Sequence, residues 1–151
     1  MRSGAAASLL SAVVLALGGL IENRAAAGPL NGPSQWIFGR WAAYLRRPSL
    51  RHTLTGILIH HLTATGWALL HERVLGSSKT AQTPAQRLGR AAATASVANV
   101  VDFKLTPKRL TPGFEHQLSR KSLFFVYAAF AVGLAVWGAA LTDRQKAPAR
   151  E

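Results

Sequence analysis

Two adjacent histidines, His60 and His61, lie within an uncharged apolar stretch over residues 53–70, which is long enough to cross a bilayer. Ionisable side chains inside a membrane are costly and rare, so they are candidates for function. With about 100° between successive helical residues, the two imidazoles point to different faces of one helix, and His61 shares its face with Glu72. A regular helix therefore cannot direct both histidines at one metal ion.

Three roles for these imidazoles follow from their chemistry. A metal centre would need further ligands from another helix, and a b-type haem would need a second axial ligand from another helix or a second chain. The third role is hydrogen bonding across a helix bundle to Asn99, Asp102 or the backbone. We favour this third role and expect neither a metal nor a cofactor. The acidic and imidazole groups available to complete a metal site are Glu72, Asp102, Glu115 and His116.

A second polar group follows later in the chain. Asn99 and Asp102 lie three residues apart and share a helix face. Asp102 precedes a stiff segment with two Leu-Thr-Pro triplets, and we expect this segment to fold back so that Arg109 pairs with the carboxylate. The alternative is a proton or cation relay between Asp102 and a histidine. The predicted functional cluster consists of His60, His61, Glu72, Asn99, Asp102, Arg109 and Glu115.

The elements that position these groups are apolar blocks separated by short arginine-rich segments. The chain has 151 residues, of which 49% are hydrophobic. We predict one all-α membrane domain, a polytopic bundle of about four transmembrane helices plus a short interfacial helix. The predicted spans are 5–21, 53–72, 86–105 and 122–141, with the interfacial helix over 34–46 and a polar tail over 143–151.

Local signals refine these boundaries. Gly and Pro residues predict a loop over 28–33, and Ser49 and Thr83 are predicted helix caps, the latter with Pro84 at the first helical position. The helix over 86–105 is rich in small residues and suits the centre of a bundle. The first block also fits a signal peptide, with a cleavage region over 25–27. We favour a retained helix because polar residues separate the block from that region.

Charge and composition narrow the classes of function. The net charge is +12, which would fit a nucleic-acid binder. The apolar blocks favour a bilayer instead, whose anionic lipids attract Lys and Arg. There is no cysteine, which excludes disulfides, cysteine-ligated metals and thiol catalysis. The chain has neither a Gly-x-Ser-x-Gly elbow nor a phosphate-binding glycine loop. We therefore expect no enzyme and no nucleic-acid partner.

Several short sequence motifs are similar to motifs of a known family, and together they extend over most of the chain except its two ends. They are Asn31-Gly32-Pro33-Ser34-Gln35-Trp36-Ile37-Phe38-Gly39, Thr55-Gly56, Ile59-His60-His61, Trp67-Ala68 with Glu72, Val101-Asp102-Phe103, and Pro107-Lys108-Arg109-Leu110-Thr111-Pro112-Gly113-Phe114-Glu115. The chain resembles a family of small, functionally uncharacterised inner-membrane proteins of Proteobacteria. That resemblance implies location and topology and brings no catalytic residue. Where the family is expected to have Asn-Ala-Pro-Ser-His-Trp, this chain has Gly32 and Gln35, which weakens a metal role here.

The expected function is that of a non-enzymatic, multi-pass protein of the bacterial inner membrane. Its polar motifs would hold the bundle together or contact lipid, a partner membrane protein or a second copy of the chain. One alternative is a small transporter or proton-conducting component that uses His60, His61, Asp102 and Glu72. A second alternative is a metal- or haem-binding membrane protein.

Overall fold

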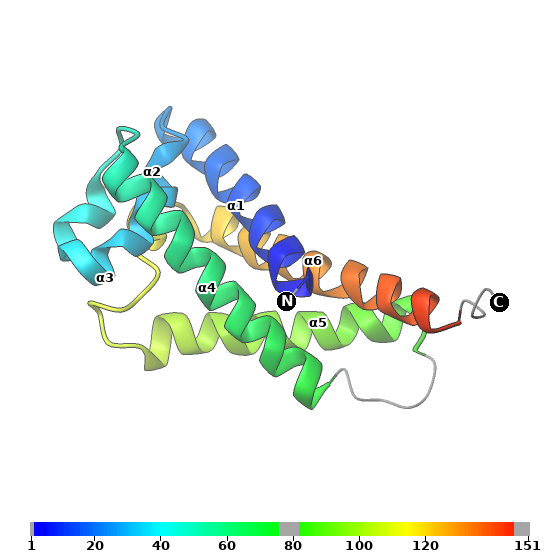
Figure 1. Cartoon of the computed structure of the whole chain (residues 1–151). Coiled ribbons are helices and arrows are strands. Elements are labelled where there is room, and N and C mark those ends of the chain that lie inside the picture. Colours follow the sequence, from blue (N-terminus) through cyan, green and yellow to red (C-terminus); the bar gives the residue numbers. More distant parts are fainter. Residues whose placement is uncertain (1, 76–81, 147–151) are drawn as a thin grey trace.

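The computed structural model describes residues 2–75 and 82–146 of the chain, and within these ranges it contains helices and no strands. Four long helices dominate: α1 (Arg2–Asn23), α4 (Leu50–Val74), α5 (Pro84–Val100) and α6 (Arg120–Lys146) (Figure 1). The all-α prediction is thus confirmed. Residues 143–146 of the predicted polar tail belong to α6, and the rest of that tail lies outside the described residues.

The long helices pack unequally. α1 packs along both α6 and α4, and α5 packs along α6, whereas α4 and α5 meet at few residues (Figure 1). Small residues permit the closest contact: a methyl group added at Gly133 of α6 would lie 2.4 Å from the Cα of Ala7 in α1. Such close backbone approach is typical of helices that associate within membranes.

The helix caps and the end of α5 follow the sequence signals. The Ser49 side chain accepts a hydrogen bond from the His52 backbone N–H, and Thr83 forms a capping box with Gln86, so both predicted caps are confirmed. The helical course of α5 continues through a π-helical turn, η3 (Val101–Leu105). The predicted helix over 86–105 is therefore present, with its last turn widened at Asp102.

Residues 24–49 and 106–119 form one end of the bundle, which we call the capped end. Its short helices are α2 (Ala27–Asn31), η1 (Gly32–Ser34), α3 (Gln35–Phe38), η2 (Arg40–Tyr44) and η4 (Phe114–His116). The loop predicted over 28–33 was wrong, because this stretch is helical. The continuous helix predicted over 34–46 was also wrong, because Gly39 has φ +91° and interrupts it.

Two buried amides bind the backbone of the capped end. The Asn31 side chain donates to the carbonyls of Leu45 (2.9 Å) and Arg47 (3.0 Å). The Gln117 side chain donates to the carbonyl of Ala43 at 2.8 Å and to that of Leu45 at 3.1 Å. Leu45 and Arg47 lie outside the helices and Ala43 lies in the last turn of η2, so the two amides replace the partners that a longer helix would supply.

The two most prominent sequence motifs meet at the capped end. Gln35 and Trp36 both donate side-chain hydrogen bonds to the carbonyl of Thr111, at 2.7 Å and 3.1 Å. Nearby, a methyl group at Gly32 would lie 2.6 Å from the Phe114 nitrogen, and one at Gly113 would lie 2.4 Å from the Gly32 oxygen. The two chain segments are therefore in backbone contact at Gly32 and Gly113.

The distribution of side chains between inside and outside is unusual. Most buried apolar residues are alanines, and Ser3, Ser8 and Ser11 are buried with them. Large apolar side chains instead cover the outside of all four long helices, as with Ile21 (80% exposed) and Leu50 (89% exposed). Among the described helices, one is apolar and long enough by composition to cross a membrane, Ser3–Asn23 within α1.

Candidate functional site

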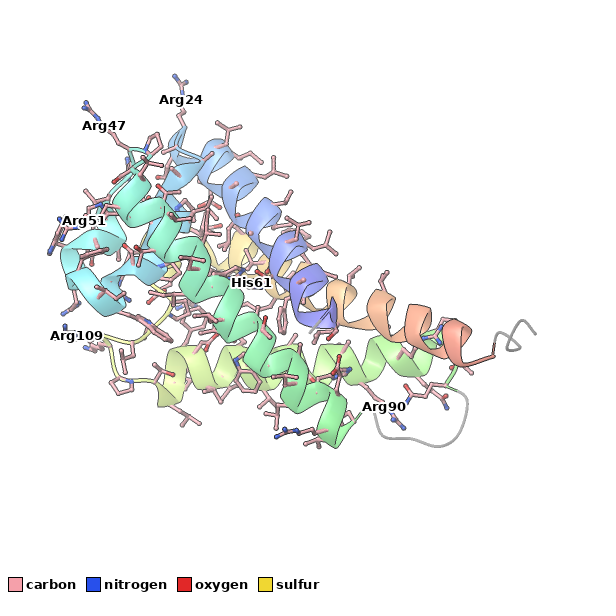
Figure 2. All side chains as sticks on the ribbon, viewed as in Figure 1. Arg24, Arg47, Arg51, His61, Arg90 and Arg109 are labelled. Carbon is pink, nitrogen blue, oxygen red and sulfur yellow. The ribbon has the colours of Figure 1, made fainter. Side chains whose placement is uncertain are left out.

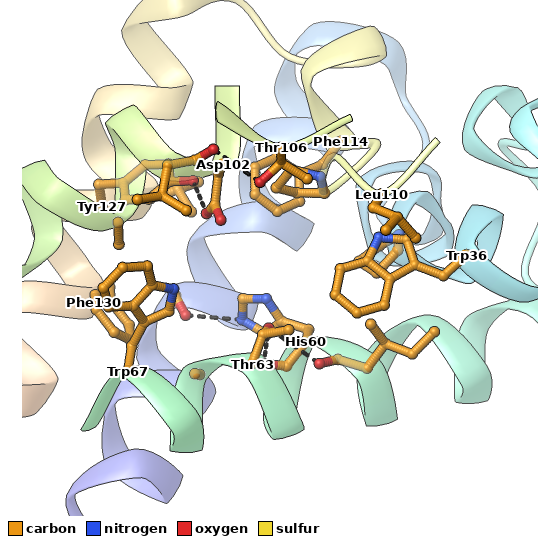
Figure 3. Close-up of a pocket in the computed structure, with 18 of the residues that line it drawn as sticks. Trp36, His60, Thr63, Trp67, Asp102, Thr106, Leu110, Phe114, Tyr127 and Phe130 are labelled. Atoms are coloured by element: carbon orange, nitrogen blue, oxygen red, sulfur yellow. Dashed lines mark hydrogen bonds between the residues drawn. The ribbon is translucent and has the colours of Figure 1, made fainter. Parts of the chain in front are cut away.

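A cavity of about 450 Å³ lies between the four long helices and the capped end (Figure 3). Most of its wall is apolar, with two tryptophans, Trp36 and Trp67, and the rings of Phe114 and Phe130. Residues of both α4 and α5 line it, and these two helices meet at few residues. The polar side chains that line the cavity are Ser11, His60, Thr63, Asp102, Thr106 and Tyr127.

His60 enters this cavity from the middle of α4. Its Nε2 lies 2.9 Å from Oγ of Ser11, a buried residue of α1. Where the Ser11 hydroxyl donates to the carbonyl of Ala7 (2.8 Å), the same oxygen is left to accept from Nε2–H of the imidazole. A neutral ring with its proton on Nε2 leaves Nδ1 as an acceptor, and Figure 3 shows this side of the ring turned toward the cavity.

Asp102 faces His60 from the other side of the cavity (Figure 3). The Tyr127 hydroxyl of α6 donates to Oδ2 of Asp102 at 2.6 Å. A short hydrogen bond to a carboxylate is stronger than one between neutral groups. Because Asp102 lies in the π turn at the end of α5, its side chain is aimed inward, toward α6. The carboxylate keeps a second oxygen that takes part in no protein hydrogen bond or ion pair within the described residues.

The predicted pairing of Asp102 with Arg109 does not form. Arg109 is exposed, and Figure 2 shows it at the outer edge of the capped end, directed away from the bundle. The reason is that Gln35 and Trp36 hold the carbonyl of Thr111 and so keep the segment before it at the outer surface. The partner that sequence reasoning missed is Tyr127, which looks like one more apolar residue of a spanning block.

The other members of the predicted cluster lie elsewhere. His61 is exposed on the outer face of α4 (Figure 2). Glu72 lies near the C-terminal end of α4, where its carboxylate accepts a hydrogen bond from the Ser3 hydroxyl. Asn99 lines a separate groove between α5 and α6. The cavity thus brings together His60 and Asp102 and leaves the remaining candidates outside it.

Glu115 belongs to the capped end. Its carboxylate lies 3.8 Å from Nε2 of His116, whose ring stacks on Tyr44 with 4.8 Å between centroids. Within residues 2–75 and 82–146, no three His, Asp or Glu side chains are grouped so that they could hold a metal ion.

The buried serine was the second partner that the sequence did not identify. Ser11 was not predicted to be the partner of His60. The available signal was its position about midway along an uncharged apolar helix, where a hydroxyl needs a hydrogen-bond partner. A polar side chain at a matching depth on another predicted span, such as His60, is the natural candidate.

Replacing Tyr127 by Phe tests the Asp102 hydrogen bond. We expect Tyr127→Phe to lower the stability of the purified protein by about 1–3 kcal/mol, because it leaves a half-buried carboxylate without its donor. The measurement is thermal unfolding in detergent. Tyr44→Phe is the matched control and should have little effect, because the Tyr44 hydroxyl contacts His116 at the surface. Equal stability of Tyr127→Phe and wild type would show that the bond is unimportant.

Comparison with known proteins finds no matching family model, no similar curated protein and no similar solved structure, so the geometry of the cavity is the basis for assigning a function.

Proposed function

We propose that the chain is an integral membrane protein whose four long helices are embedded in a bilayer, with the bacterial inner membrane as its location. The supporting observation is the outward placement of large apolar side chains around a core of alanine and serine. Exposed apolar side chains in large number are a sign of contact with a membrane or a partner. In a bilayer, such side chains face lipid and small residues bring helices together. The resemblance of its motifs to small inner-membrane proteins supports the same location.

Helix length agrees with this placement. α4 has 25 residues and α6 has 27, and about 20 helical residues cross the apolar core of a bilayer. α1 packs along two of the other helices and supplies Ser11 to the cavity. A retained α1, rather than a cleaved signal peptide, is therefore part of the proposal.

We further propose that the protein acts by binding rather than by catalysis, and that its cavity takes an amphipathic ligand with a cationic or hydrogen-bond-donating head. The cavity offers two acceptors, the free oxygen of Asp102 and Nδ1 of His60, on opposite sides. An ammonium group carries the donors that such acceptors need. The apolar wall, rich in aromatic rings, suits a hydrocarbon or aromatic body.

Membrane embedding is tested by extraction of the full-length chain expressed in bacterial cells. We expect the protein to remain in the membrane pellet after an alkaline carbonate wash and to be released by detergent, because its outer surface is apolar. Release of the protein by carbonate alone would contradict the proposal. A peripheral membrane protein of the same cells serves as the control that must be released.

Ligand binding is tested with a fluorescent long-chain alkylamine added to the purified protein in detergent. We expect saturable binding, and about tenfold weaker binding to Asp102→Asn, because a hydrogen bond to a charged group contributes about 1.5–3 kcal/mol. The asparagine oxygen still accepts from Tyr127, so the fold should be kept. An alkyl sulfonate of equal chain length is the control ligand. Binding of amine and sulfonate with equal affinity would contradict the proposed head group.

A second candidate function is proton transfer across the membrane. The specific observation in its favour is that His60 and Asp102, two groups that exchange protons, line one cavity. His60 lies ten residues into α4, which places it about 15 Å along that helix, near the middle of a bilayer core of about 30 Å.

Replacing each of the two adjacent histidines in turn tests this second function. The purified protein is placed in liposomes with an internal pH-sensitive dye, and a pH step is applied. For a proton pathway we expect His60→Ala to abolish the flux and His61→Ala to leave it unchanged, because only His60 lines the cavity. Flux equal to that of protein-free liposomes would exclude this function.

A further inference from the structure

A second depression lies on the other side of α5, between α5 and α6. We call it the α5–α6 groove. Its volume is about 760 Å³. Small residues of α5 and α6 form its floor, among them Ala92, Ser96 and Ala128, and the exposed ring of Phe124 stands at its edge.

Two cations lie at one end of the α5–α6 groove. Lys104, in the π turn after α5, and Arg120, the first residue of α6, both line it and are both exposed. Within the described residues, neither forms an ion pair with a carboxylate. Two positive charges from different helices therefore lie at this end of the groove. The carboxylate that contacts the start of α6, that of Glu22, accepts hydrogen bonds from Ser119 and Ser122.

Polarity changes along the α5–α6 groove in one direction. Asn99 lies five residues before Lys104, so it is about 7 Å deeper along α5, and its side chain forms no hydrogen bond within the described part of the chain. Beyond Asn99, the groove continues past Ser96 to Ala92 and becomes apolar. The order along the groove is thus two cations, one amide and then an apolar channel.

This order matches the structure of a phospholipid, and we propose that the α5–α6 groove binds one anionic phospholipid. The phosphate lies between Lys104 and Arg120, an ester carbonyl accepts from the Asn99 amide, and an acyl chain follows the small residues toward Ala92. The distance from Lys104 to Ala92 is twelve helical residues, about 18 Å. One leaflet of the bilayer core is about 15 Å thick. The proposal rests on the membrane placement given above and is independent of the ligand in the cavity.

The test uses the purified full-length chain in a non-ionic detergent and native mass spectrometry. The probes are phosphatidylglycerol and phosphatidylcholine with identical acyl chains, added at equal concentrations. We expect wild type to retain one phosphatidylglycerol in preference to phosphatidylcholine. The double variant Lys104→Gln/Arg120→Gln should bind phosphatidylglycerol about thirtyfold more weakly, given the contribution of each basic residue near anionic lipid.

The matched control removes the same charge from the same end of the bundle. Lys108→Gln/Arg109→Gln replaces two exposed cations that lie outside the α5–α6 groove and should keep the wild-type affinity. An equal loss in this control would show that binding depends on diffuse charge, and absence of a lipid preference in wild type would also overturn the proposal.

A second pair of variants tests the apolar part of the groove. Ser96→Leu should fill the groove and weaken retention of phosphatidylglycerol, whereas Ala93→Leu, an exposed neighbour outside the groove, should not. Glycerol phosphate without acyl chains should fail to compete; effective competition would identify a phosphate site instead of a lipid site. A lipid-free dimer that Ser96→Leu disperses would assign the groove to a second copy and overturn the proposal.

Membrane placement is measured separately, by the carbonate wash. Wild type that stays in the carbonate-washed pellet but shows no preference for phosphatidylglycerol overturns the lipid site alone. Release of wild type from the pellet by carbonate overturns the membrane placement instead.

Discussion

Every polar group of the backbone needs a hydrogen-bond partner when water is absent, and this constraint determines the construction of the capped end. A regular helix meets it internally, but residues 24–49 turn several times through short helices and extended links. Their carbonyls are instead bound by the side-chain amides of Asn31 and Gln117. Irregular backbone is tolerated at membrane depth where protein side chains satisfy it. The capped end is therefore a polar structure that can close an otherwise apolar bundle.

A second set of side-chain hydrogen bonds explains how the cavity is kept in shape. Gln35 and Trp36 fix the carbonyl of Thr111, and the glycine contact between Gly32 and Gly113 leaves no room for a side chain. The docked segments supply part of the cavity wall, including Trp36 and Phe114. The cavity consequently depends on two sequence motifs far apart in the chain. Gln35 acts in this contact as a hydrogen-bond donor to backbone, a role that needs no metal.

Structural elements that depend on residues close together in the chain were predicted correctly from the sequence. The long helices follow from apolar blocks, and the caps at Ser49 and Thr83 follow from side chains that bind backbone one turn away. The loop expected at 28–33 failed because Gly and Pro also occur in short helices when tertiary contacts hold them, here the bonds of Asn31. Gly39 shows the opposite error, since a positive φ broke a helix that its neighbours favoured.

The separation of the two histidines was predictable, whereas their partners were not. Helical geometry alone placed them on different faces, and His60 lines the cavity while His61 is exposed. Which residues they meet depends on how helices far apart in sequence are arranged. Ser11 and Asp102 approach His60 from α1 and α5, and Arg109 is held away by contacts that no local pattern reveals.

Tyr127 connects the two sites that the fold creates. Its hydroxyl donates to Asp102 on the cavity side, and its side chain also lines the α5–α6 groove, where Asn99 lies on the neighbouring face of α5. One ring is thus a wall shared by both spaces. The position of this ring therefore sets part of the wall of the cavity and part of the wall of the α5–α6 groove.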